Sequence, residues 1–356
     1  MEMNRVVIVG GGLSGICLTH QLLQRGIEPV LIDAGVNHSS RIAAGMINPM
    51  VFRTMVKTWK GDLLIPYLKE FYPKMEKEIN AQFFFPRTIR RLFSTEDERK
   101  KWMEREKDEA YSDYIFKIDE SQPTPNYAKN QFGNGLVKSP GYIDANKFLA
   151  GNYAYFKRLG ILKQEPFQFD KLDVEKSTYN NVRYDILIFS EGYRGKSNPY
   201  FGYLPLQQTK GEVLTIRSEQ IRQNEILNRK CFVLPTEDGF YRLGATFSWN
   251  TTDVSPTDEA RHQLLKQYNA ISAAEIDVID QQGGIRPTVT DRRPLIGAHP
   301  EIKGLFIFNG MGTKGYMIAP YYSAHFITHL IDGSALDDEV NIKRFEKKHY
   351  IPKVDE

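Results

Sequence analysis

The stretch RVVIVGGGLSGICLTHQLLQRGIEPVLIDAG, residues 5–35, decides the fold. Its first residues, Val6 to Val9, form a short apolar run rich in β-branched side chains, which is typical of a buried parallel strand. A glycine loop follows, then an apolar helix pattern that stops near Gly26, then a second strand over residues 29–32. Strand, helix and strand in this order predict a parallel β-α-β unit.

The glycines of this stretch have the spacing Gly10-x-Gly12-x-x-Gly15. Gly10 permits the tight turn, Gly12 lets the backbone approach a pyrophosphate, and Gly15 lets the helix pack closely on the strand. The helix N-terminus offers N–H groups and partial positive charge to phosphates. Asp33 ends the second strand, where a carboxylate accepts hydrogen bonds from ribose hydroxyls and disfavours a 2′-phosphate. We therefore predict a dinucleotide site, which this motif alone does not assign to FAD or NAD.

The residues behind Asp33 are unusually small. The stretch SSRIAAGMINPM, residues 39–50, contains Ala43, Ala44 and Gly45, followed by an Asn-Pro pair. Small residues and a proline-fixed turn favour close packing of the backbone against a buried planar ring. A plain surface loop is the alternative interpretation.

The bulk composition is that of an ordinary globular protein. A chain of 356 residues favours two domains. With 47 basic and 44 acidic residues the net charge is +3, so no global field attracts nucleic acid. Cys17 and Cys231 form no metal-binding or redox pattern, so we expect no metal site and a cytoplasmic location. No signal peptide and no membrane span are expected.

The rest of the chain alternates between helix and strand patterns. We expect a helix over residues 54–80, interrupted at Pro66 and Pro73, and one that runs from Asp144 to Gly160. A buried strand is predicted in YDILIFSEG, residues 184–192, and an antiparallel sheet in the segments KGEVLTIRS, KCFVLPTEDG and YRLGATFSW. The parallel-type strands thus lie at the start, middle and end of the chain.

This alternation predicts an α/β fold, α+β overall, with two discontinuous domains. Residues 1–50, 140–200 and 284–345 would form a Rossmann-like nucleotide domain with a parallel sheet. Residues 51–139 and 201–283 would form a substrate or cap domain with an antiparallel sheet. No second GxGxxG motif is followed by a strand and an acidic residue, which indicates a small organic electron donor instead of NAD(P)H.

The segment before the C-terminus carries a second strand, glycine loop and helix. LFIFNG, residues 305–310, leads into GMGTKG, and we expect the helix to begin near Ala319 with Pro320 in its first turn. A helix N-terminus aimed at a flavin would stabilise negative charge on the reduced ring. Lys314 either adds to this field or is solvated. Arg286, in GGIRPT, is either a bidentate clamp for a substrate carboxylate or a structural arginine that holds loop carbonyls.

Taken together, these motifs resemble the D-amino-acid-oxidase superfamily of FAD-dependent oxidoreductases, and within it the glycine oxidases. The resemblance rests on GxGxxG with Asp33, AAGMI, KGEVLTI, CFVLP, GATFSW, IRPTVTDRRPLIG and the closing glycine loop before Ala-Pro. It implies non-covalent FAD in a Rossmann-like domain with an antiparallel sheet over the flavin. It also implies oxidation of a C–N bond to an imine, with oxygen or another acceptor reoxidising the flavin.

The resemblance also assigns site residues. Arg286 matches the carboxylate-binding arginine, and Arg286 and Lys314 are the candidate catalytic residues. Arg286, Phe232 and Met46 are the expected substrate contacts. The expected cofactor contacts are Gly10, Gly12, Leu13, Ser14, Gly15, Asp33, Ala34, Ala43, Ala44, Gly45, Met46, Gly192, Gly310, Gly312, Thr313, Lys314 and Gly315.

Two positions depart from the glycine oxidase pattern. Phe232 stands where those enzymes have a tyrosine, and Thr313 stands where they have a second arginine, which argues against glycine itself as the substrate. No cysteine is expected near the segments that contact the ring, so a covalent flavin link is not expected.

Three functions remain open at this stage. The first is oxidation of a small amine or amino acid by hydride transfer to flavin N5. The second is oxidation of a side chain on a tRNA wobble uridine, because GMGTKG also resembles that flavin domain and RTIRR, residues 87–91, would contact phosphates. The near-neutral charge makes a nucleic-acid partner less favoured. The third is a non-catalytic protein that holds flavin. The sequence leaves the oligomeric state open.

Overall fold

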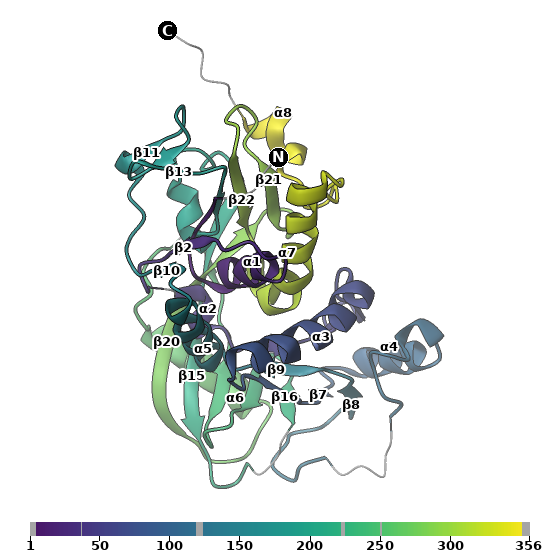
Figure 1. Cartoon of the computed structure of the whole chain (residues 1–356). Helices are drawn as coiled ribbons and strands as arrows, with labels where there is room; N and C mark the ends of the chain where they lie inside the picture. The colour runs from purple at the N-terminus through teal and green to yellow at the C-terminus, as the bar shows by residue number, and fades with distance from the viewer. Residues whose placement is uncertain (1–4, 37, 119–123, 222–224, 250, 351–356) are drawn as a thin grey trace.

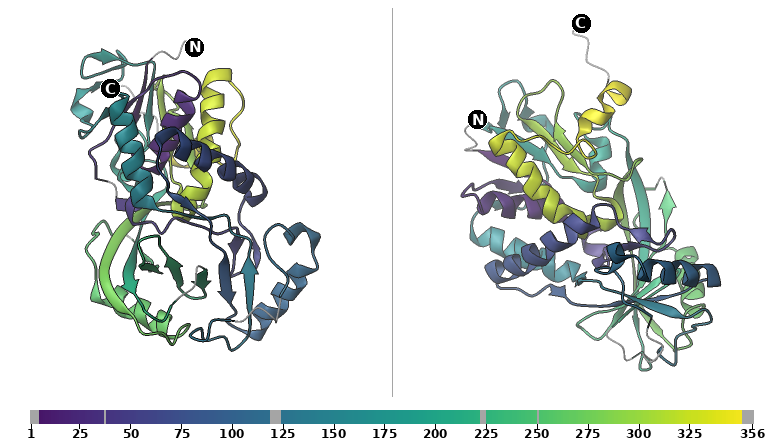
Figure 2. Two further views of the ribbon diagram at one scale, coloured as in Figure 1. Left: turned by 60° about the horizontal axis from the view of Figure 1, so that its bottom comes forward. Right: turned by 90° about the vertical axis from the view of Figure 1, so that its right-hand side faces the viewer.

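The computed structural model describes residues 5–36, 38–118, 124–221, 225–249 and 251–350. It has two main sheets, which lie in different halves of the molecule (Figure 1). The first, called here the parallel sheet, has six strands in the order β10-β2-β1-β14-β22-β21. The second, the antiparallel sheet, contains eight strands, with β20 paired to β15 at one side. Figure 2 shows the same two halves in two further views.

The parallel sheet is built around its most apolar strands. β1 (Val6–Val9) lies between β2 (Val30–Ile32) and β14 (Ile186–Phe189), and all three run parallel, as do β10 (Leu162–Lys163) and β22 (Leu305–Asn309) at their outer sides. Only β21 (Leu295–Ala298) runs antiparallel, against β22. The parallel strands come from the start, the middle and the end of the chain, as predicted. The exact domain boundaries stay a prediction.

Helices cover one face of the parallel sheet. α1 (Leu13–Leu23) lies beside α7 (Gly315–Asp332), and α3 (Gly61–Ile79) contacts both α7 and α5 (Ala145–Arg158). Side chains of β1 and of these helices form one continuous apolar core. On the other strand face, Phe189 packs with an aromatic cluster that includes Phe167 and Phe169. No helix within the described ranges is both long and apolar enough to cross a membrane.

The antiparallel sheet depends on two long strands. β15 (Leu206–Arg217) and β20 (Asp277–Val289) pair along almost their whole length. On its other side β15 pairs with β18 (Tyr241–Gly244) and β19 (Ser248–Trp249), and β17 (Phe232–Pro235), β16 (Ile226–Asn228), β7 (Ile89–Leu92) and β8 (Asn134–Val137) complete the sheet. α6 (Asp258–Asn269) contacts β15 and β18. The predicted antiparallel pairing of the three segments is therefore confirmed.

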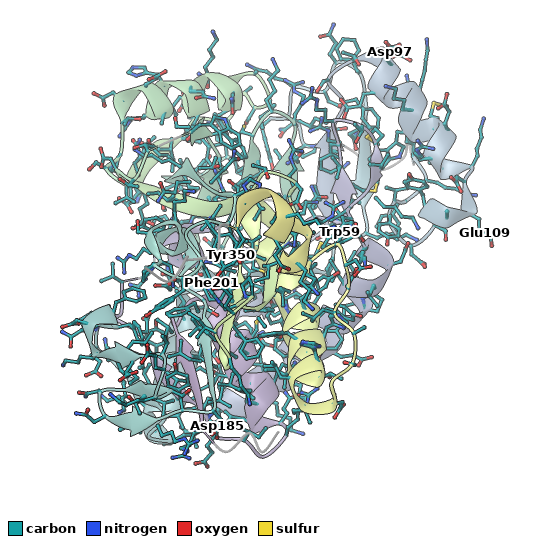
Figure 3. The ribbon with its side chains drawn as sticks, turned by 90° about the horizontal axis from the view of Figure 1, so that it is seen from above. Trp59, Asp97, Glu109, Asp185, Phe201 and Tyr350 are labelled. Atoms are coloured by element: carbon teal, nitrogen blue, oxygen red, sulfur yellow. The ribbon has the colours of Figure 1, made fainter. Side chains whose placement is uncertain are left out.

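Three helix caps follow from the sequence. Asp144 accepts hydrogen bonds from the N–H groups of Asn146 and Lys147 at the start of α5, and Thr257 caps α6. Thr95 caps α4 (Glu96–Glu106), which protrudes from the antiparallel half. Asp97 and Glu109, labelled in Figure 3, lie near the two ends of this protrusion. Short polar side chains at these positions satisfy N–H groups that the helix itself leaves free.

α3 continues through both of its prolines, so the predicted interruptions are wrong. Pro66 and Pro73 are seven residues apart, and both lie on the exposed side of the helix. The carbonyls that lose a backbone donor therefore remain on the solvent side. The opposite side of α3 buries a row of apolar side chains, and this packing maintains the helix. Those side chains are Leu64, Leu68, Phe71, Tyr72, Met75 and Ile79.

α7 begins at Gly315, so the prediction of a start near Ala319 is wrong. Pro320 lies inside the helix and is buried. Because proline has no N–H, the carbonyl of Tyr316 one turn earlier loses its helical donor. The hydroxyl of Tyr72, on α3, donates to that carbonyl at 2.6 Å. A side chain from another helix thus replaces the missing hydrogen bond, which a local sequence pattern cannot reveal.

The start of α3 is tied to the last part of the chain. The Trp59 ring stacks on Tyr322 with a centroid distance of 5.5 Å, and the Arg293 guanidinium lies 4.5 Å from the Trp59 ring centroid. Arg293 and Trp59 both contact the carboxylate of Glu339. Trp59 is labelled in Figure 3, near the middle of the molecule.

Candidate functional site

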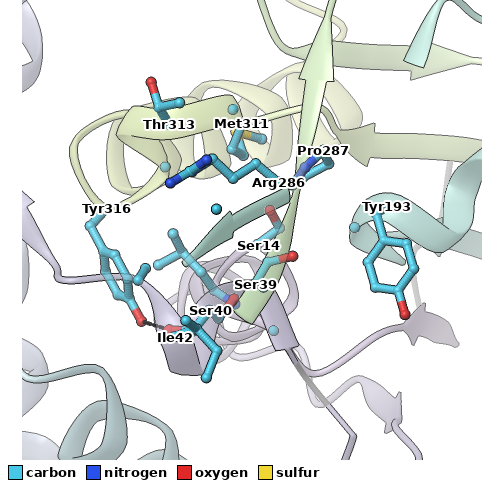
Figure 4. A pocket seen from close by; sticks show the side chains of 18 of the residues that line it. Ser14, Ser39, Ser40, Ile42, Tyr193, Arg286, Pro287, Met311, Thr313 and Tyr316 are labelled. Carbon is cyan, nitrogen blue, oxygen red and sulfur yellow. Dashed lines mark hydrogen bonds between the residues drawn. The ribbon is translucent and has the colours of Figure 1, made fainter. Parts of the chain in front are cut away.

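One large cavity lies between the two sheets. Its volume is about 780 Å³, within the usual range for small-molecule sites. The parallel sheet contributes loops at the carboxyl ends of β1, β2 and β14, and the antiparallel sheet contributes residues of β15, β17, β18 and β20. Figure 4 shows this cavity, with Arg286 projecting into it from β20. The predicted cofactor and substrate residues line it, with two exceptions, Gly15 and Gly310.

The N-terminus of α1 faces this cavity. Ser40 Oγ accepts from the Leu13 N–H at 3.1 Å, and no described side chain caps the other N–H groups of the first turn. Gly12 is the N-cap residue, and the first turn contains no acidic residue. Gly10 has φ +104°, and a Cβ there would lie 2.5 Å from the Ser190 carbonyl oxygen. Gly15 does not line the cavity, because a Cβ there would lie 1.9 Å from the Gly10 carbonyl oxygen. Uncapped N–H groups at a helix start form an anion site, so this end suits a pyrophosphate.

Asp33 is fixed before any ligand arrives. Its Oδ1 accepts from the Gly11 N–H at 2.9 Å, and its Oδ2 accepts from the Gly35 N–H at 2.8 Å and from the Tyr153 hydroxyl. Tyr153 comes from α5, far away in sequence, and was not predicted. The three donors hold the carboxylate at the end of β2, where a ribose hydroxyl would meet it.

The small residues after Asp33 form one wall of the cavity. Ala43, Ala44, Gly45 and Met46 all line it, and Met46 begins β3 (Met46–Ile47). Gly45 has φ +69°, and a Cβ there would lie 1.9 Å from the carbonyl oxygen of Ile143. A larger residue would therefore push this segment away from its neighbour.

A second helix start faces the same cavity. The 3₁₀ turn Gly312–Lys314 leads directly into α7, and neither has a side-chain cap. Gly312, Thr313, Lys314 and Gly315 line the cavity. Gly310 does not line the cavity, because a Cβ at this glycine would meet the side chains of Val289 and Leu295 instead. The cavity is thus flanked by two helix N-termini, each with partial positive charge.

Lys314 is partly buried and protein oxygen atoms hold its ammonium group, so its solvated interpretation is wrong. Its Nζ donates to the carbonyl oxygens of Asn48, at 2.9 Å, and Met50, at 3.4 Å, and to the Thr58 hydroxyl. Burial lowers the pKa of Lys314 to about 8. No carboxylate within the described residues forms an ion pair with this ammonium group. Its charge is therefore available to an anionic ligand in the cavity.

Arg286 partly fits both interpretations of its role. Its Nη1 donates to the carbonyl oxygens of Lys210, at 3.4 Å, and Thr246, at 3.2 Å. Its guanidinium lies 4.4 Å from the ring centroid of Phe247 and rests on Gly211, where a Cβ would approach Nη2 to 2.0 Å. Burial lowers the pKa of Arg286 to about 10, and the guanidinium pairs with no carboxylate of the described residues. Nε and Nη2 remain free to bind an anion.

Phe232 and Cys231 lie together in the part of the cavity wall that the antiparallel sheet forms. The Phe232 ring packs on Gly244, where a Cβ would lie 2.8 Å from the end of the ring. Cys231 also lines the cavity, whereas the expectation of no cysteine near the ring-contacting segments stays a prediction. Burial raises the pKa of Cys231 to about 12, which keeps its thiol protonated and unreactive at neutral pH.

Other residues of the wall were not found by sequence reasoning. Glu191 follows β14, and burial raises its pKa to about 7, while Asn198 donates to its Oε2 at 2.6 Å. Neither Glu191 nor the other wall residues named next form a recognisable sequence motif. The set also includes Ser39, Ser40, Asn48, Tyr193, Arg194, Gln208, Asn228, Lys230, Phe247 and Tyr316.

The basic cluster RTIRR is not an open anion site. Arg90 forms an ion pair with Glu225 at 2.6 Å, and Arg91 with Glu98 at 2.7 Å, and both arginines are buried. Arg87 pairs with Glu237. Because each charge is already neutralised, the predicted contact of this cluster with phosphates is wrong.

Comparison with known families agrees with this geometry. The sequence model of the FAD dependent oxidoreductase family, DAO, matches residues 5–330. The chain belongs to this family. FAD is accordingly its cofactor, and the cavity fits it, because the start of α1, Asp33 and a second helix start with Lys314 all line it.

Individual relatives point to two activities. The chain is 21% identical to a glycine oxidase of Pseudomonas aeruginosa, over 92% of this chain and 95% of that protein. It is 24% identical to the tRNA 5-methylaminomethyl-2-thiouridine biosynthesis bifunctional protein MnmC of Campylobacter concisus, over 84% of this chain. The alignment covers 49% of that protein, so the chain spans about half the length of this relative.

A solved structure shows the same fold. The crystal structure of glycine oxidase from Geobacillus kaustophilus superposes with a TM-score of 0.81 at 18% identity, and the match covers 98% of this chain and 100% of that one. At this identity the likeness establishes the Rossmann-type fold with its antiparallel second sheet, and not the substrate.

Proposed function

We propose that this flavoprotein oxidises the C–N bond of a small amine or amino acid that carries a carboxylate. The observation that carries the proposal is Arg286, a partly buried guanidinium without an acidic partner in the described residues, which projects into the FAD cavity. A partly desolvated cation of this kind favours an anionic ligand, and two donors without a partner in the described residues suit a carboxylate.

The residues of the chain support a mechanism based on orientation. Bound FAD supplies the hydride acceptor. Arg286 holds the substrate carboxylate and thereby fixes the direction of the adjacent carbon. The hydride leaves that carbon while the lone pair of the neutral amine forms the C=N bond, and water then hydrolyses the imine to a carbonyl compound and ammonia, or to an amine where the donor nitrogen is substituted.

No general base is needed on the substrate side. The only carboxylates in the described part of the cavity wall are Asp33 and Glu191, and both lie at the carboxyl ends of parallel strands. The two helix starts and Lys314 stabilise negative charge in the cavity. The substrate must therefore bind as the free amine, and kcat/KM should rise with pH as the amine loses its proton.

A donor screen under nitrogen tests this function. Glycine, sarcosine, proline and D-amino acids are mixed with the purified FAD-bound protein, and bleaching of the flavin absorbance is recorded. At least one carboxylated amine should bleach the flavin. Arg286→Ala should raise KM for carboxylated donors by about 100-fold, and much less for amines without a carboxylate, because a lost charged hydrogen-bond pair costs about 2–3 kcal/mol. Equal effects on both donor types would remove the clamp role.

A second candidate is oxidation of a modified tRNA base. Similarity to the MnmC protein favours it, and so does Phe247, which lines the cavity and is 57% exposed. An exposed aromatic ring beside an arginine can stack on a base. Salt-dependent binding of tRNA, combined with no bleaching by small amines, would support this candidate over the first. Flavin that only dithionite reduces would instead indicate a non-catalytic flavin-holding protein.

We also propose a cytoplasmic location. Cys17 and Cys231 are both buried and unpaired, as expected for a reducing compartment.

A further inference from the structure

The charges in the cavity wall are unbalanced. Four cationic side chains of the described residues line it: Arg194, Lys230, Arg286 and Lys314. The two acidic residues, Asp33 and Glu191, both lie at the parallel-sheet end, where Asp33 already accepts three hydrogen bonds. The antiparallel-sheet end therefore presents positive charge without a carboxylate of its own among the described residues.

Lys230 is the second cation at that end. It stands in the short connection between β16 and β17, two residues before Phe232. Phe232 pairs with Gly244 on β18. Thr246 stands two residues after Gly244, and its carbonyl accepts a hydrogen bond from Arg286. Because neighbouring antiparallel strands run in opposite directions, Lys230 and Thr246 lie at the same end of the β17–β18 pair. Lys230 and the Arg286 guanidinium are thus at one end of the cavity.

The two cations differ in their surroundings. Arg286 is partly buried between Gly211 and Phe247, whereas Lys230 is exposed at the cavity wall. Lys230 forms no ion pair or hydrogen bond with any other described residue. A packed arginine with a fixed fork selects a carboxylate, and an exposed, flexible lysine attracts a second anionic group by charge alone.

We propose that the preferred donor carries two anionic groups: one carboxylate on Arg286 and a second carboxylate or phosphate near Lys230. This inference rests on the proposed amine oxidation and specifies its substrate class. A donor with one carboxylate would leave Lys230 without a partner. Since Lys230 is exposed, its contribution should be modest and should decrease as the salt concentration rises.

The main test compares donors of nearly equal size that differ in one charge. Iminodiacetate is compared with its monoamide, and D-aspartate with D-asparagine, for kcat/KM at low ionic strength. O-phospho-D-serine against D-serine distinguishes a phosphate from a carboxylate as the second group. We expect the doubly anionic member of at least one pair to be favoured by about threefold or more, and about 0.5 M salt should abolish most of this preference.

Lys230 variants identify the responsible side chain. Lys230→Gln should lower the ratio of kcat/KM between iminodiacetate and its monoamide by about threefold, and Lys230→Glu by about tenfold. Lys266→Gln is the matched control, because Lys266 is an exposed lysine on α6 that does not line the cavity. An unchanged ratio in Lys230→Glu would overturn the inference and leave amine oxidation intact.

A binding measurement tests the proposed dianion site separately from the proposed amine oxidation. Malonate and acetate are titrated into the oxidised protein, and their binding is followed by the shift of the flavin absorbance. Malonate should bind at least about threefold more tightly than acetate, and Lys230→Gln should reduce this ratio. If no amine bleaches the flavin but malonate is still preferred through Lys230, the proposed oxidation fails and the dianion site stands. If malonate is not preferred over acetate and tRNA displaces neither anion, the dianion site fails. If tRNA displaces the anions at low salt, Lys230 is reassigned to the binding of a polynucleotide.

Discussion

The two ends of the cavity offer different groups to a ligand. At the parallel-sheet end, these groups are backbone amides of α1 and a carboxylate that Gly11, Gly35 and Tyr153 already hold. At the antiparallel-sheet end, they are long side chains with positive charge, chiefly Arg286 and Lys230, and no described carboxylate balances them. The first end is fixed by the course of the backbone, and the second is determined by which side chains project from the sheet.

This difference separates cofactor binding from substrate selection. Changes that touch the backbone of the glycine loop should remove FAD, whereas changes on the antiparallel sheet should alter the donor and retain FAD. The three predictions below test this separation, in order of decreasing effect.

The largest effect is expected from Gly15→Ala. The new Cβ would lie 1.9 Å from the Gly10 carbonyl oxygen, and neither backbone segment can move away cheaply. We expect a loss of about 3 kcal/mol in the free energy of unfolding and protein purified without yellow colour. The measurements are the ratio of absorbance at the flavin band to that of the protein, and urea unfolding.

Gly26→Ala is the control for this change. Gly26 follows the same helix and has φ +74°, but nothing lies within 4 Å of a Cβ there. It should cost only about 1 kcal/mol and leave the flavin content unchanged. A normal flavin content in Gly15→Ala would show that close packing at this loop is not needed for FAD.

The second prediction concerns Lys314, which is partly buried beside the cavity. Its pKa in the folded protein, about 8, lies below the usual value of 10.5. Between these two pKa values, the unfolded chain holds the ammonium proton more strongly than the folded chain does. Raising the pH through this range therefore increases the free energy of unfolding. Between pH 7 and pH 9.5, the FAD-free wild type should gain about 2 kcal/mol in unfolding free energy relative to Lys314→Met. Urea unfolding of both proteins at several pH values measures it, and parallel pH profiles would contradict it.

The third prediction concerns Gly211, which supports the Arg286 guanidinium. A Cβ in Gly211→Ala would lie 2.0 Å from Nη2 of Arg286 and would displace this flexible end without moving the strand. We expect KM for carboxylated donors to rise about tenfold, equivalent to about 1.4 kcal/mol, with FAD retained. Steady-state kinetics and the flavin absorbance test it together.

Gly239→Ala offers a control for Gly211→Ala in the same sheet. Gly239 lies in the turn between β17 and β18, and nothing lies within 4 Å of a Cβ there. It should leave KM unchanged, although its φ of +83° costs some stability. Loss of FAD in Gly211→Ala would break the separation between the two ends.

The parallel-sheet end could be predicted from the sequence because its residues are close together in the chain. The spacing of Gly10, Gly12 and Gly15 and the position of Asp33 follow from the geometry of one β-α-β unit. The start of α5 at Asp144 was found for the same reason, since a cap depends only on the next three residues.

Features that depend on distant residues could not be predicted. The course of α7 through Pro320 depends on Tyr72 from α3, and the fixed position of Asp33 depends on Tyr153 from α5. The burial of Lys314 depends on the carbonyls of residues 48 and 50. Composition and local spacing carry no information on such contacts. At the antiparallel-sheet end the residues alone predicted the strands and left the role of Arg286 open, and the family resemblance added Phe232.

The alternation along β15 has a consequence for how this scaffold acquires new activities. Gly211 and Val213 face the cavity, whereas Leu214 and Ile216 belong to the apolar core that includes Leu264 of α6. A mutant library confined to the cavity-facing positions of this sheet would therefore vary donor preference while the folding core stays constant. Insertion of one residue into β15 would exchange the two faces and destroy both properties at once.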